Sequence, residues 1–244
     1  MNDYEFLKLE KKGKICILIL NRPEKKNALS EVLRNEIIDA LDHLKEDNKI
    51  RTVIFYGNEG FFSTGFDKDE VQASISSPEK AEQLKISSLL IHKKMFEFPK
   101  LTIAAISGYA LGGGFDLAVL CHLRVASKNA IFGHPEIAFG ACPLFFSYMS
   151  LVGRGKALEL VLNTASRETF INAKEAYELN IINKLVDDGN ALNEAINMAK
   201  QINKSPKLTI SMLIQVNNAF FDQYKAYETE VETIMRNMVI MKKI

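Results

Sequence analysis

The chain has 244 residues, of which 47% are hydrophobic and 25% charged, an ordinary composition for a globular protein with a sizeable core. Its 31 lysine and arginine residues nearly balance its 30 aspartate and glutamate residues, so the overall charge favours neither nucleic acid nor a membrane surface as a partner. The sequence shows no apolar signal-peptide core, and its apolar runs are shorter than the roughly 18–20 residues of a membrane-spanning helix.

The cysteines and histidines show no metal-binding or disulfide pattern. Cys16, Cys121 and Cys142 contain no C-x-x-C pair, and an odd number of cysteines argues against a disulfide framework. The four histidines lack the H-E-x-x-H motif and the spacing of zinc ligands. We therefore expect a cytoplasmic protein without a metal and without a resident cofactor.

The first 65 residues predict a hairpin, a helix, a strand and a loop. Segments 4–10 and 14–20 read as two strands around a turn at Gly13, and 52–56 as a β-branched strand. Segment 57–65 holds three glycines and is predicted to be a loop. Between the strands, Ser30 can cap a helix whose apolar residues recur at three- and four-residue steps. These residues are Leu29, Val32, Leu33, Ile37, Ala40, Leu41 and Leu44.

The rest of the chain continues the alternation and then becomes helical. A helix is predicted from Ser77 to about Phe98, followed by a buried strand over Leu101–Ile106 and an apolar helix that ends near Cys121. Segments 123–126 and 130–132 read as strands, whereas the chain from 144 onward reads as helices with one short strand at 182–186. This order predicts an α/β fold with parallel strand pairing and helical crossovers.

Two glycine-containing loops follow predicted strands. The first contains Gly65, and the second, Gly112-Gly113-Gly114, opens a helix. In open α/β sheets ligands bind outside the carboxyl ends of the strands, where both loops lie. Glycine lets backbone N–H groups approach a ligand, and two such groups from two loops would form an oxyanion hole. A tight connection without a ligand is the alternative interpretation of the triple glycine.

Two acidic residues stand in apolar surroundings. Asp116 lies one turn into the helix that the glycines open, and Glu136 lies in a segment rich in apolar residues. A buried carboxylate is costly unless it is paired, hydrogen-bonded or protonated. Two carboxylates in one pocket would suit acid and base catalysis on a water and a carbon atom. The alternatives are a backbone or arginine partner for Asp116 and a solvated position for Glu136.

The order of these features resembles the enoyl-CoA hydratase/isomerase (crotonase) superfamily over nearly the whole chain. The resemblance implies an α/β crotonase-like fold of repeated strand-strand-helix units with a helical C-terminal region. We expect a core over 1–190, a helical oligomerisation or lid region over 191–244, and homotrimers or hexamers. The motifs are Leu20-Asn21-Arg22-Pro23 with Lys26-Asn27-Ala28-Leu29, Phe62-Ser63-Thr64-Gly65-Phe66-Asp67, Gly108-Tyr109-Ala110-Leu111-Gly112-Gly113-Gly114-Phe115-Asp116, Ala130-Ile131-Phe132-Gly133-His134-Pro135-Glu136-Ile137, and segment 173–186.

The resemblance assigns roles to individual positions. The N–H groups of Phe66 and Gly113 would hold the thioester oxygen, and Glu136 would deliver a proton to the α-carbon. Asp116 stands where two-carboxylate hydratases usually carry glutamate, and would orient or deprotonate the attacking water. The substrate's coenzyme A would be held by residues of two loops. These residues are Lys25, Lys26, Ala28, Thr64, Asp67 and Lys68.

The resemblance leaves the reaction open. We expect an enoyl-CoA hydratase that adds water across a 2,3-double bond. The alternatives are a Δ3,Δ2-enoyl-CoA isomerase, in which Asp116 is a spectator, and a non-catalytic acyl-CoA binding protein. Segment 140–146 carries bulky residues where hydratases are rich in glycine, which suggests an unusual acyl group. His122 stands where relatives commonly have aspartate, and we expect it to be structural and not a base.

Overall fold

The computed structural model describes residues 3–58, 60–139, 143, 145–163, 166–220 and 229. Within these residues the strands are β1 (Leu7–Lys12), β2 (Ile15–Leu20), β3 (Thr52–Gly57), β4 (Phe61–Ser63), β5 (Leu101–Ile106), β6 (Tyr109–Leu111), β7 (Leu123–Ser127), β8 (Ile131–Gly133), β9 (Ile171–Asn172) and β10 (Lys184–Val186). The α-helices are α1 (Glu31–Glu46), α2 (Lys68–Ser76), α3 (Pro78–Glu97), α4 (Gly113–Leu120), α5 (Phe146–Val152), α6 (Arg154–Asn163), α7 (Ala173–Glu178), α8 (Ala191–Ile202) and α9 (Lys207–Phe220). Short 3-10 helices lie at η1 (Pro23–Lys25), η2 (Pro135–Phe139) and η3 (Arg167–Thr169).

The strands form two sheets. The larger has the order β1-β2-β3-β5-β7-β10, and the smaller has the order β4-β6-β8-β9. β1 and β2 form the predicted antiparallel hairpin, whereas β2, β3, β5, β7 and β10 pair in parallel. Strand pairs followed by helices recur as β1-β2-α1, β3-β4-α2, β5-β6-α4 and β7-β8-α5. The predicted α/β fold of repeated strand-strand-helix units is therefore confirmed.

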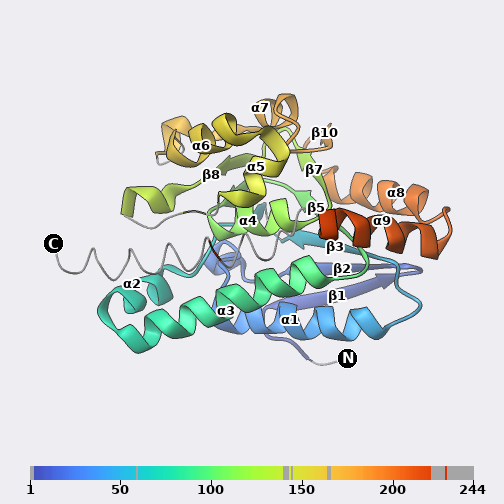
Figure 1. Cartoon of the computed structure of the whole chain (residues 1–244), viewed down its shortest axis with the longest axis horizontal. Helices are drawn as coiled ribbons and strands as arrows, with labels where there is room; N and C mark the ends of the chain where they lie inside the picture. The colour runs from blue at the N-terminus through green and yellow to red at the C-terminus, as the bar shows by residue number, and fades with distance from the viewer. Residues whose placement is uncertain are drawn as a thin grey trace.

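Both faces of the larger sheet are covered, which β2 shows residue by residue. Cys16, Leu18 and Leu20 belong to the apolar core shared with α1, whereas Ile15 and Ile17 belong to the core shared with α8. Successive side chains of a strand point to opposite faces, so a strand buried on both faces reads as a continuous apolar run. Figure 1 shows α1 and α3 on one side of this sheet and α8 and α9 on the other.

Local signals placed the long helices correctly. The Ser30 hydroxyl accepts a hydrogen bond from the Leu33 N–H at the start of α1, and Ser77 does the same for Lys80 at the start of α3. One residue of the predicted apolar stripe was wrong, because Val32 is 45% exposed. Arg34 is buried instead, since its guanidinium bonds to the Leu29 carbonyl oxygen and pairs with Glu70.

Several short elements were not predicted from the sequence. β4 and β6 lie in segments that the glycines marked as loops, β9 lies in the part of the chain that was predicted to be helical, and α2 had no assigned structure. β4, β6 and β9 are each two or three residues long and gain their hydrogen bonds from distant partners in the smaller sheet. Of the segments singled out in the sequence, residues 140–142 and 144 of segment 140–146 and residues 221–228 and 230–244 of the predicted helical region lie outside the described residues.

Candidate active site

The two glycine loops lie against each other. Gly65 has a φ of 91°, which favours glycine, and its backbone carbonyl oxygen accepts from the Leu29 N–H at 2.8 Å. A Cβ atom at Gly65 would lie 2.8 Å from the Leu111 oxygen and 3.0 Å from the Gly113 nitrogen. Only a residue without a side chain therefore allows this approach.

The backbone donors expected from the resemblance lie at this junction. The Phe66 ring packs on Gly113, where a Cβ atom would lie 3.3 Å from ring atom Cε2. Gly113 is the first residue of α4, so its N–H points out of the helix without an intrahelical acceptor. Among the described residues, neither this N–H nor that of Phe66 donates to a backbone acceptor. This arrangement is compatible with an oxyanion hole, and the roles of Phe66 and Gly113 remain predictions.

The carboxylate of Glu136 faces the same junction. Its Oε2 lies 3.0 Å from the position that a Cβ atom at Gly112 would take, and its Oε1 lies 3.0 Å from Nδ1 of His134. The Glu136 side chain is 24% exposed, but Oε2 itself is buried and has no hydrogen-bond partner among the described residues. One oxygen is thus held by the protein while the other faces the glycine loop.

Asp116 is buried one turn into α4, at 4% exposure. Its Oδ1 accepts a hydrogen bond of 2.8 Å from the Tyr148 hydroxyl on α5. The Tyr148 ring meets the His134 ring edge-on at 5.0 Å, and Phe115 stacks on His134 at 5.3 Å. These aromatic contacts place the groups that hold Asp116 and Glu136 in one packed cluster.

The charges of the cluster change the protonation of His134. Burial by itself would lower the pKa of this imidazole, but its hydrogen bond to Glu136 and the negative charges of Asp116 and Glu136 raise it. The net effect is a pKa above the ordinary histidine value. His134 therefore keeps its proton to a higher pH than an exposed histidine would.

The sequence interpretation missed His134 and Tyr148 as members of the site. His134 stands two residues before Glu136 inside a recognised motif, and this spacing could have drawn attention to it. Tyr148 follows Asp116 by 32 residues and carries no local signal. Its role depends on how α5 packs against α4, which the sequence pattern does not encode.

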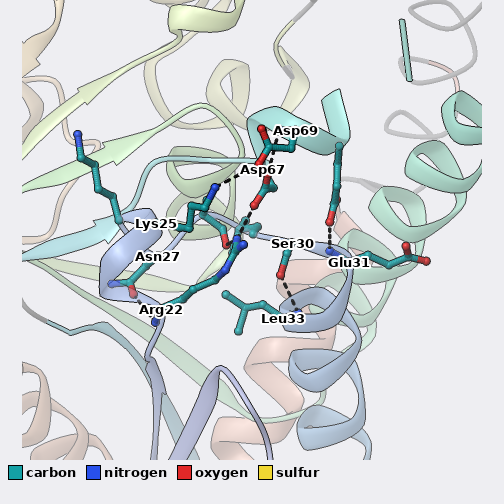
Figure 2. Close-up of polar contacts among 12 residues, drawn as sticks. Arg22, Lys25, Asn27, Ser30, Glu31, Leu33, Asp67 and Asp69 are labelled. Atoms are coloured by element: carbon teal, nitrogen blue, oxygen red, sulfur yellow. Dashed lines mark hydrogen bonds and ion pairs between the residues drawn. The ribbon is translucent and has the colours of Figure 1, made fainter. Parts of the chain in front are cut away.

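The loops expected to hold coenzyme A lie side by side (Figure 2). Asp67 caps α2 by accepting from the Asp69 N–H, and its other oxygen is 2.5 Å from the Arg22 guanidinium. Burial would raise the pKa of the Asp67 carboxyl, but the bonds to Arg22 and to the backbone lower it overall. The side chain of Asp67 therefore joins the two loops, and Arg22 is a member of this region that the sequence interpretation missed.

The other residues expected to hold coenzyme A include three exposed lysines. The Lys25 ammonium is 3.1 Å from Asp69 in an exposed ion pair, and the Lys26 ammonium lies 5.8 Å from the centre of the Phe61 ring. Lys68 is exposed at the start of α2. Ala28 is buried, and the Thr64 hydroxyl donates to the Lys26 carbonyl oxygen at 3.3 Å. The three ammonium groups can thus reach solvent or an anionic ligand.

His122 lies away from this site, at the other end of α4. Its ring Nδ1 accepts from the Thr102 backbone N–H at 3.1 Å, and the backbone N–H of His122 donates to the Thr102 hydroxyl at 3.0 Å. Burial and the charge of Arg124 lower the pKa of His122 to about 4. These contacts agree with the expected structural role.

Two structural features are absent from the described part of the chain. No group of three or more histidine, cysteine, aspartate or glutamate side chains there could hold a metal ion. No helix in the same part of the chain is long and apolar enough to cross a membrane.

Comparison with known proteins assigns the family. The model of the family "Enoyl-CoA hydratase/isomerase" matches residues 10–243. A probable mitochondrial enoyl-CoA hydratase of Dictyostelium discoideum is 35% identical over 216 residues, covering 87% of this chain and 75% of that protein. A crotonyl-CoA hydratase of Syntrophomonas wolfei is 34% identical over 213 residues, covering 86% and 80%. The chain belongs to the enoyl-CoA hydratase/isomerase family.

A solved structure supports the same assignment. An enoyl-CoA hydratase/isomerase from Xanthobacter autotrophicus Py2 superposes with a TM-score of 0.87 at 27% sequence identity, covering 96% of this chain and 87% of that one. The resemblance inferred from the motifs is therefore confirmed at the level of both sequence and fold.

Proposed function

We propose that this protein is an enoyl-CoA hydratase, which adds water across the 2,3-double bond of an enoyl-CoA thioester. The observation that carries the proposal is the placement of Glu136. Its Oε2 has no partner among the residues that the structure describes and faces the glycine loop, while His134 holds Oε1. Relatives that are 34–35% identical are named enoyl-CoA or crotonyl-CoA hydratases, which supports the same activity.

In this proposal the substrate's thioester oxygen receives hydrogen bonds from the Phe66 and Gly113 N–H groups. These donors stabilise the negative charge that develops as the enolate forms. Asp116 takes a proton from water as the hydroxide adds to the β-carbon. Glu136 delivers a proton from Oε2 to the α-carbon, and solvent returns a proton from Asp116 to Glu136. Atoms and charges balance, because one water enters and one 3-hydroxyacyl thioester forms.

Turnover of a small panel of CoA thioesters tests the proposal. The panel contains crotonyl-, 3-hexenoyl-, a branched or cyclic enoyl- and a saturated acyl-CoA, each followed by mass and by loss of conjugated absorbance. We expect a mass gain of one water with an enoyl substrate, and a loss of about 10³-fold in kcat for Glu136→Gln, since a positioned acid or base contributes about 10²–10⁴. The best substrate identifies the acyl class.

The isomerase alternative gives a different result with Asp116→Asn. Hydration should collapse in this variant because Asp116 handles the water, whereas migration of the double bond needs Glu136 alone. Bond migration without a mass change would contradict the hydratase proposal in favour of the Δ3,Δ2-isomerase. Binding of CoA with no turnover of any thioester would leave the acyl-CoA binding protein.

We also propose that coenzyme A lies along the cradle of Lys25, Lys26, Ala28, Thr64, Asp67 and Lys68. The exposed ammonium groups of the three lysines support this placement, since they suit the phosphates of the ligand. The cofactor requirement is limited to coenzyme A as part of the substrate. Weaker CoA binding in a Lys25→Ala, Lys26→Ala double variant, measured by calorimetry, would support the cradle.

Assembly and location complete the proposal. We propose a cytoplasmic homotrimer or hexamer in which segment 191–244 supplies helical contacts to the core over 1–190. Exposed apolar side chains on α9, among them Leu208, Leu213 and Val216, support a contact surface there. Light scattering coupled to size-exclusion chromatography measures the oligomer directly, and a monomer would contradict this part.

A further inference from the structure

His134 lies between Glu136 and Tyr148 in the candidate site and is fully buried. It is 0% exposed, and its Nδ1 is 3.0 Å from Oε1 of Glu136. Phe115 stacks on one face of the imidazole, and the Tyr148 ring meets it edge-on. Packing on these rings limits how the imidazole can turn, so the hydrogen bond to Glu136 has a defined direction.

We propose that His134 is a positioning residue that holds Glu136 at Oε1 and so keeps Oε2 toward the substrate. The inference rests on the proposed hydratase function and deepens it. A carboxylate on a short 3-10 helix would otherwise rotate about its side-chain bonds. The contact at Oε1 fixes that rotation and leaves Oε2 as the oxygen that faces Gly112.

The charges around His134 determine the expected pH dependence. The titratable groups that face it are Glu136 on η2, Asp116 on α4 and Tyr148 on α5. Burial lowers the pKa of His134, but the hydrogen bond to Glu136 and the charges of Asp116 and Glu136 raise it overall, so this imidazole keeps its proton above the pH at which an ordinary histidine loses it. Hydration should slow as the pH rises through the pKa of His134, because loss of this proton removes the charge that strengthens the hydrogen bond to Glu136.

Two variants separate positioning from charge. His134→Phe keeps the ring packing but cannot bond to Glu136, so we expect kcat to fall about 10²-fold with little change in KM, the cost of a misplaced catalytic group. His134→Gln retains an N–H donor and should restore about tenfold of that loss. Neither variant carries a titrating group at position 134, so the decrease of kcat at the pKa of His134 should be absent from the pH profiles of both.

The matched control is His43→Gln, which changes an exposed histidine on α1. This variant should keep the wild-type kcat and pH profile. Circular dichroism and the urea midpoint of each variant show whether it is folded. Wild-type kcat and pH profiles in both His134 variants, alongside an inactive Glu136→Gln, would overturn the inference and leave the hydratase proposal standing.

A second measurement does not depend on activity. Titration of the histidine ring signals by NMR should give a His134 pKa above about 6.5 in the wild type, and a lower pKa in Glu136→Gln, where the negative charge is lost. An unchanged His134 pKa in Glu136→Gln would overturn the pairing. Absence of thioester turnover in the wild type would overturn the proposed function, while this titration would still decide whether the pair exists.

Discussion

Buried polar groups lie near both ends of helix α4, and the two ends differ in whether these groups have hydrogen-bond partners. At the C-terminal end the guanidinium of Arg124 donates to the carbonyl oxygens of Val119, Cys121 and Ile181. At the N-terminal end, by contrast, Oε2 of Glu136 is buried without a hydrogen-bond partner among the described residues.

The C-terminal end is built for stability. A helix leaves its last carbonyl groups without intrahelical partners, and a cation there also complements the helix dipole. Burial lowers the pKa of Arg124 to about 10, which still leaves the group charged at neutral pH. His122 is satisfied in the same way by Thr102. The polar side chains at this end therefore have protein partners.

The N-terminal end leaves polar capacity for a ligand. An unmade hydrogen bond in a buried site costs free energy, and folded proteins keep few such groups. The Glu136 oxygen and the N–H groups of Phe66 and Gly113, none of which has a hydrogen-bond partner in the described part of the chain, lie together at one junction. The comparison indicates that the functional end of the helix is the end where the protein does not satisfy its own polar groups.

The largest effect on stability is expected at the C-terminal end. Arg124→Met removes the donors to several buried carbonyl groups, so the free energy of unfolding should fall by about 4 kcal/mol. Urea denaturation measures the change, with Arg51→Met as a matched control, because Arg51 donates to two carbonyl groups at a partly exposed position. A wild-type urea midpoint in Arg124→Met would contradict the stabilising role assigned to the C-terminal end of α4.

The second effect concerns activity at the N-terminal end. Gly112 has a φ of 50°, and a Cβ atom there would lie 3.0 Å from Oε2 of Glu136. Gly112→Ala should displace the carboxylate and lower kcat about 10²-fold. Gly153→Ala is the matched control, because Gly153 has a φ of 78° with nothing within 4 Å of the added atom. Steady-state kinetics should show a loss of kcat in the first variant alone, and equal losses would show that backbone strain is the cause.

The third effect is a dependence of stability on pH at the C-terminal end. The folded-state pKa of His122 is lowered to about 4, so between pH 6.5 and 4 the unfolded chain takes up a proton that the folded chain does not. Stability is therefore lost as the pH falls through this window, by about 2 kcal/mol at pH 5 for one such histidine.

The variant His122→Gln sharpens this prediction. It should lose less stability than the wild type between pH 7 and pH 5, measured by urea unfolding at each pH. His92, whose pKa burial also lowers to about 4, should account for part of the remaining slope. His43→Gln serves as the exposed control. If stability changes equally with pH in the wild type, His122→Gln and His43→Gln, the pKa of His122 is the same in the folded and unfolded states, and the prediction is wrong.

The sequence predicted those elements whose signals are local. The hairpin of β1 and β2, the Ser30 cap of α1 and the Ser77-Pro78 start of α3 depend on periodicity and capping within a few residues, and the structure confirms them. β4, β6 and β9 were missed because strands of two or three residues show no periodicity. Arg34 was missed as a buried residue because its partners Glu70 and Ser87 are distant in sequence.

The sequence by itself determined the family, the two glycine loops and the two carboxylates, because each depends on residue types at fixed short spacings. Only the tertiary structure decided which polar groups are paired. Tyr148 reaches Asp116 across 32 residues, and Arg22 reaches Asp67 across 45. Such pairs form when helices and loops pack against one another, and packing depends on the shape of the whole core.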